Sequence, residues 1–149
     1  MASRAEDRKA ELGEQLGEQV RARLPAAEAP VVEAFLRSYF RDVAPSDLIE
    51  REPLDLYGSA LAHLRFGQQR RAGEARIRAY NPDIEQHGWR STHTVVEVVT
   101  DDMPFLVDSA LGALTRLDLP MQTLVHPVLP VRRDAAGQTQ HVIIIESVT

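Results

Sequence analysis

Residues 97–120, EVVTDDMPFLVDSALGALTRLDLP, contain the change of pattern that decides the fold class. Valines run into two aspartates, and Pro104 then opens a segment with apolar residues at helical spacing: Leu106, Ala110, Ala113, Leu114 and Leu117. This spacing predicts a helix over 103–117, and the β-branched residues at 92–100 (THTVVEVVT) predict a buried strand before it. The stretch therefore reads as a strand, an acidic corner and a helix.

The acidic side chains of this corner are Asp101, Asp102 and Asp108. They could hold a cation, or present carboxylates to a ligand amine. The alternative, which we favour, is that Asp101 or Asp102 caps the helix and interacts with its positive end, a contribution of about 1 kcal/mol. Asp108, one turn further on, would then simply face solvent. On this interpretation the corner is rigid, capped and structural.

The other predicted strands flank this stretch at 75–80, 121–133 and 140–148, the last two joined by a hairpin loop at 134–138. Pro127 and Pro130 confine their segment to an edge or a bulged strand. Strand, helix, strand, hairpin and strand form the first two-thirds of a ferredoxin-like βαββαβ sandwich. We expect either that a longer polypeptide supplies the last helix and strand, or that 75–80 takes the missing strand's place beside 92–100.

The first half of the chain predicts three helices, at 4–23, 30–42 and 53–69. Short loops make them antiparallel neighbours. A narrow stripe on the first helix needs a docking partner, which could be another chain: Leu12, Leu16, Val20 and Leu24. Ser46 is expected to cap a short turn, and Trp89 to anchor a long loop. The fold class is α+β: a helical segment over 1–72, then an incomplete ferredoxin-like domain over 73–149.

Composition excludes several kinds of chemistry. The chain has 149 residues, 44% of them hydrophobic, enough to bury a core without a metal or disulfide. With no cysteine it has no thiolate nucleophile and no zinc–cysteine site. Its glycines form neither a dinucleotide-binding motif nor a P-loop, and Lys9 is its only lysine. We expect no catalytic residue, no cofactor-binding residue and no metal ligand in this chain.

Histidine and arginine give weaker signals. His93 and His141 lie on strands that could be neighbours and could share a metal, but we favour ordinary imidazoles. One basic cluster is present: Arg65, Arg70, Arg71, Arg76 and Arg78. The strands lack the stacking aromatics of an RNA-binding sheet, and the net charge is -5. We favour a solvated basic face, with contact to an acidic neighbouring domain next and RNA binding last.

The chain also lacks the marks of export or membrane insertion. Its first 20 residues mix acids with bases and contain no apolar core of a secretion signal. No apolar run approaches the roughly 18–20 residues that a membrane span needs. We therefore expect a cytoplasmic protein without membrane or nucleic-acid partners.

Three runs resemble the amino-terminal region of the large NAD-dependent glutamate dehydrogenases of bacteria: VVTDDMPFLVDS (98–109), LVHPVLPVRRD (124–134) and YFRDVAPSDLIERE (39–52). The resemblance implies ACT-like domains of ferredoxin fold, with the catalytic and NAD-binding part far downstream. It implies a parent enzyme that deaminates L-glutamate to 2-oxoglutarate with NAD, and a region here that binds no cofactor. The implied partners are other domains of the parent chain and, through the open sheet edge, a second copy.

The corner departs from the pattern of amino-acid-binding ACT domains. These typically place D-x-P-G-L-L there, because the glycine lets the backbone approach a ligand carboxylate. Here Pro104, which has no N–H, replaces that glycine, and Asp102 would repel a carboxylate. The leading hypothesis is therefore a non-catalytic regulatory or oligomerisation region that acts through the sheet edge and the 12–24 stripe. The alternative is an amino-acid sensor whose effector binds Asp101, Asp102, Met103 and Phe105.

Overall fold

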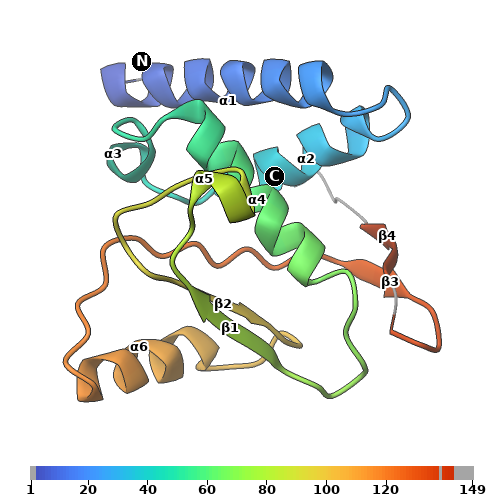
Figure 1. Cartoon of the computed structure of the whole chain (residues 1–149). Helices are drawn as coiled ribbons and strands as arrows, with labels where there is room; N and C mark the ends of the chain where they lie inside the picture. The colour runs from blue at the N-terminus through green and yellow to red at the C-terminus, as the bar shows by residue number, and fades with distance from the viewer. Residues whose placement is uncertain (1–2, 138, 143–149) are drawn as a thin grey trace.

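The structure, a computed structural model, describes residues 3–137 and 139–142. Its elements are α1 (Arg4–Arg23), α2 (Ala29–Phe40), α3 (Pro45–Leu48), α4 (Pro53–Phe66), β1 (Arg76–Tyr80), α5 (Ile84–His87), β2 (Val95–Val99), α6 (Leu106–Arg116), β3 (Val131–Arg133) and β4 (Thr139–Val142). Figure 1 shows α1, α2 and α4 on one side of the β1–β2 pair and α6 on the other. The predicted α+β class is confirmed.

The apolar stripe of α1 is the centre of the core. Leu12, Leu16 and Val20 are buried with the apolar faces of α2 and α4. A capping box between Ser3 and Glu6 begins the helix. Lys9 of α1 binds the segment just after α2, since its Nζ donates to the carbonyls of Arg41 and Val43. The stripe therefore docks inside this chain, and the expectation that it offers a surface to another chain is wrong.

The helices α3 and α4 both begin with a proline, and neither has a serine as its cap. The predicted cap at Ser46 is wrong, because α3 begins at Pro45 and has no side-chain hydrogen bond at that end. Pro53 is the first residue of α4, as predicted. A proline suits this position, since its φ is already helical and the first N–H has no helical partner.

The loop after β1 folds against α4 through Trp89. Asp83 caps the short helix α5, and Gly88, with φ 77°, ends it. Trp89 is 1% exposed. A Cβ added to Gly58 of α4 would lie only 2.7 Å from Trp89 Cγ. The prediction that this indole anchors the loop is confirmed, and Gly58 leaves the space for it.

The described strands form two separate antiparallel pairs. β1 pairs with β2, as in the second of the two alternatives, in which 75–80 lies beside 92–100. β3 pairs with β4 in a hairpin of its own, and only Val131–Arg133 of the predicted strand 121–133 is a strand. One continuous ferredoxin-like sheet is therefore not seen in the described residues. Positions 143–148 of the predicted last strand lie outside them.

The β1–β2 sheet turns its charged face inward. Arg78 lies opposite Glu97 on the side of α4, and Glu97 is only 3% exposed. On the outer face Ile77 is 65% exposed and Val96 is 51% exposed. The prediction of a buried apolar strand is therefore wrong for the valines of that outer face.

The charged face of the sheet points inward because two of its arginines bind backbone carbonyls and an aromatic ring at the end of α4. Arg76 donates to the carbonyls of Phe66 and Gln69, at 3.0 and 2.8 Å. Arg78 donates to Glu97 and to the carbonyl of Ala62. Both guanidinium groups stack on the Phe66 ring, at 4.5 and 4.6 Å from its centre. The expected solvated basic face is therefore wrong for these two arginines.

Candidate functional site at the strand–helix corner

The corner between β2 and α6 is not capped by an aspartate. Phe105 is the N-cap residue of α6, and no side chain bonds to the first turn. Asp101 accepts a hydrogen bond from Arg70 Nη2 at 2.6 Å instead. The predicted cap at Asp101 or Asp102 is wrong, because no side chain caps α6 and Asp101 is bound instead by Arg70, from the segment that follows α4. Asp108 is exposed, as predicted.

Both ends of α6 have backbone strain. Phe105 has φ 63° and Asp118 has φ 55°, and no other non-glycine residue among 3–137 and 139–142 has positive φ. This conformation costs roughly 1–2 kcal/mol for a residue with a Cβ. None of the α6 side chains is fully buried. The helix therefore begins and ends at strained residues and buries no side chain completely against the sheet.

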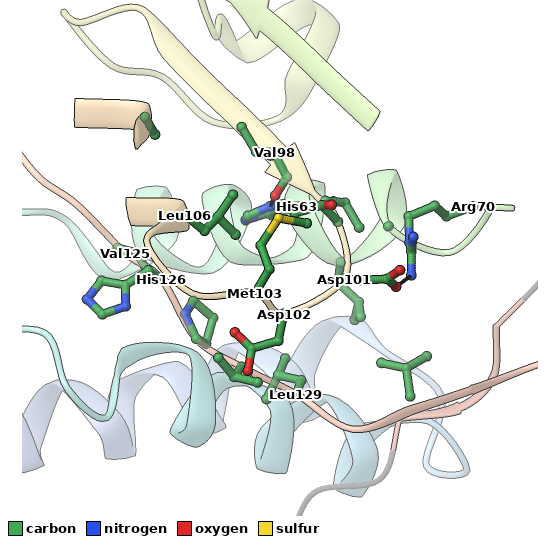
Figure 2. A pocket seen from close by; sticks show the side chains of 18 of the residues that line it. His63, Arg70, Val98, Asp101, Asp102, Met103, Leu106, Val125, His126 and Leu129 are labelled. Carbon is green, nitrogen blue, oxygen red and sulfur yellow. Dashed lines mark hydrogen bonds and ion pairs between the residues drawn. The ribbon is translucent and has the colours of Figure 1, made fainter. Parts of the chain in front are cut away.

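A cleft of about 1370 Å³ lies beside this corner. All four predicted ligand-binding residues line it: Asp101, Asp102, Met103 and Phe105. Its apolar lining comes from β2, α6 and the extended segment before β3, with Val98, Leu106, Leu111, Leu114, Val125 and Leu129. Figure 2 shows Arg70 bonded to Asp101 at one end, and Val125 and His126 at the other. The structure thus brings the predicted site residues together in one hollow.

Arginines from the segment that follows α4 and from β3 contribute the positive charges of the cleft. Arg70 donates to Asp101 and to the carbonyl of Glu74, and its backbone N–H bonds to Gly137. The pKa of Arg133 is lowered, first by burial and then by the nearby positive charge of Arg70, while Asp101 opposes the shift. Arg71 is exposed at the same rim. The cleft lining therefore contains both carboxylates and guanidinium groups, and Asp101 and Arg70 are paired with each other.

His63 of α4 joins three elements at the wall of the cleft. Its Nε2 lies 3.3 Å from the carbonyl of Val98, and its Nδ1 lies 2.9 Å from the hydroxyl of Tyr39. Because a carbonyl only accepts, Nε2 carries the proton and Nδ1 accepts from Tyr39. Burial lowers the pKa of His63, and the charge of Glu97 opposes this shift. Burial likewise raises the pKa of Tyr39.

Sequence reasoning did not single out this histidine. One signal was available: His63 follows the apolar Ala60 by three residues and so lies on the buried face of α4. The alternative of a metal shared by His93 and His141 is not supported, since His93 precedes β2 and His141 lies on β4, which belongs to a different sheet. Among 3–137 and 139–142, no three potential metal-binding side chains cluster. No helix of this part is long and apolar enough to cross a bilayer.

The fold and the cleft define an α+β domain whose strand–helix corner borders a largely apolar hollow with charged rims. A family model described as "Glutamate dehydrogenase, ACT1 domain" matches residues 35–148. The chain belongs to this glutamate dehydrogenase ACT1 family, which confirms the resemblance noted in its sequence.

Two curated relatives are each named NAD-specific glutamate dehydrogenase. The protein from Halomonas elongata is 38% identical over 137 residues, or 92% of this chain. The protein from Pseudomonas aeruginosa is 37% identical over 135 residues, or 91% of this chain. The chain spans about 8% of the length of each relative. No solved structure gives a significant match.

Proposed function

We propose that this chain is a non-catalytic regulatory and oligomerisation module of a NAD-specific glutamate dehydrogenase. The parent enzyme would oxidatively deaminate L-glutamate to 2-oxoglutarate in the cytoplasm, with NAD bound by other domains. The family match and the similarity to two such enzymes support this role. The observation that carries it is the exposed apolar lining of the corner and the outer sheet face, which suits contact with protein.

A ferredoxin-like sandwich over 73–149, preceded by the helical segment 1–72, is part of this proposal. Two features support it: the antiparallel β1–β2 pair, and α6 following β2 on the side of its apolar face. In the proposed sandwich, β1 takes the position of an edge strand.

Deleting the module from the full-length enzyme tests the proposed role. The truncated enzyme should still reduce NAD with glutamate but lose its native oligomeric state or its response to effectors. The purified chain should show no glutamate-dependent NAD reduction. Activity of the chain alone, or a truncated enzyme with unchanged assembly and regulation, would contradict the proposal.

A second candidate function is binding of an amino-acid effector in the cleft. It is favoured by one observation, that the cleft lining combines carboxylates and guanidinium groups with apolar side chains, a combination that suits a zwitterion. Calorimetry against the twenty amino acids tests it. Saturable heat should vanish in Asp101→Ala and persist in Asp47→Ala, an exposed aspartate outside the cleft lining. Absence of heat from every amino acid would exclude this function.

A further inference from the structure

Phe105 is exposed to solvent at the corner between β2 and α6. Its side chain is 77% exposed, although its backbone holds the positive φ that bulky residues avoid. Met103 beside it is 47% exposed. Asp102 and Asp108 flank this apolar pair, and neither carboxylate has a partner among the described residues. The corner is therefore an apolar projection with an acidic rim.

The cleft next to Phe105 has the complementary character. Its lining is largely apolar, with residues such as Val98, Leu111 and Leu114. The Arg71 side chain, which lines the same cleft, is exposed and has no partner among the described residues. A volume of about 1370 Å³ exceeds the roughly 300–1,000 Å³ of small-molecule pockets. The cleft is therefore large enough for side chains of another protein.

We propose that two copies of this chain associate about a two-fold axis, each seating Phe105 in the cleft of the other. Asp102 and Asp108 of one copy then face the partner's Arg71. Projection and hollow border each other on one face of the molecule, so a two-fold axis forms both contacts at once, as an isologous interface requires. Because carboxylates and a guanidinium group line the same cleft, the surface is complementary to itself, which favours a second copy over a partner whose surface carries charge of one sign. The inference rests on the proposed assembly role and gives it a surface.

Sedimentation velocity of the chain over a concentration series tests this interface. The unchanged chain should dimerise, and Phe105→Asp should raise the dimer Kd about tenfold or more, because a buried aromatic is replaced by a charge. Val31→Asp is the matched control, since Val31 is also exposed but lies on α2 outside the cleft lining. It should leave the Kd unchanged.

Two further variants distinguish the loss of an interface contact from a loss of folding stability. Phe105→Gly removes the side chain and relieves the positive φ, so it should weaken the dimer without lowering the thermal unfolding midpoint. Asp108→Arg should weaken association, and adding Arg71→Asp should restore it. Failure of the double variant to regain affinity overturns the proposed pairing.

Two outcomes reject the interface as a whole. A chain that stays monomeric at every concentration has no such dimer. A dimer with equal affinity in Phe105→Asp and Val31→Asp associates through another surface, and the assembly role then stands without this interface. Failure of the assembly role itself would appear separately, in the deletion experiment on the full-length enzyme.

Discussion

Gly58 and Trp89 show how a single residue sets a contact between distant parts of the chain. Trp89 packs where a side chain at position 58 would lie, so the helix accepts the cost of a glycine in its middle. Gly13, in the middle of α1, has open space around it. Both glycines thus lie in the middle of a helix, but a side chain at position 58 would overlap Trp89, whereas one at position 13 would meet no neighbour.

We predict opposite effects of alanine at these two glycines. Gly58→Ala should lower the free energy of unfolding by about 1–3 kcal/mol, because the new Cβ overlaps the buried indole. Gly13→Ala should raise it by about 0.5–1 kcal/mol through helix propensity alone. Urea unfolding followed by the fluorescence of Trp89, the only tryptophan, measures both. Equal effects would mean that position 58 does not contact the indole.

Asp101 shows why one expectation at this scale failed. An aspartate a few residues before a helix is typical of a cap, and the local sequence offered no competitor. The competitor is Arg70, 31 residues earlier, which reaches the carboxylate only after β1 and β2 have paired. A local rule could not include a partner that tertiary structure supplies.

At the scale of elements, periodicity predicted helices better than it predicted the environment of strands. The α1 stripe and the α6 pattern both gave helices at the expected positions, yet one is buried and the other is not. Period and propensity describe the backbone of an element, whereas burial depends on which neighbour arrives. The valines of β2 looked like core residues for the same reason.

This contrast predicts unequal costs for two leucine truncations. Leu16→Ala should lower the free energy of unfolding by about 2–5 kcal/mol, because it leaves a cavity between α1, α2 and α4. Leu117→Ala, just after α6, removes a side chain that is 68% exposed and should change it by less than about 0.5 kcal/mol. Chemical denaturation measures both. A large cost at Leu117 would show that the end of α6 packs more tightly than described.

For the whole molecule, His63 is the residue that joins the helical part to the sheet. It contacts Tyr39 of α2 and Val98 of β2, with the Arg78–Glu97 pair close by. Burial lowers its pKa from 6.5, so below about pH 6.5 the unfolded chain binds the proton that the folded chain excludes. The contribution of His63 to stability is therefore complete above that pH and is lost as the pH falls through the window below it.

We expect the free energy of unfolding to fall as the pH decreases below about 6.5, with at most about 1.4 kcal/mol per pH unit from this one group. His63→Gln keeps an amide donor for Val98 and removes the titration, so its pH dependence should be flatter. His93→Gln alters an exposed histidine and should keep the original slope. Urea denaturation at several pH values measures the slope for each of the three proteins. Equal slopes in all three proteins would assign the pH dependence to other groups.

The sequence by itself determined the α+β class, the positions of the helices, the buried indole and the family, because these follow from local period, propensity and one long motif. It also located the corner, since all four candidate residues line the cleft. Only the tertiary structure decided that Arg70 forms an ion pair with Asp101, that the charged face of β1–β2 points inward, and that His63 connects α4 with α2 and β2. Each of these depends on groups from different elements, such as Arg78 and Glu97, 19 residues apart, or Arg70 and Asp101, 31 residues apart, which pair only when the packed elements bring them within hydrogen-bonding distance.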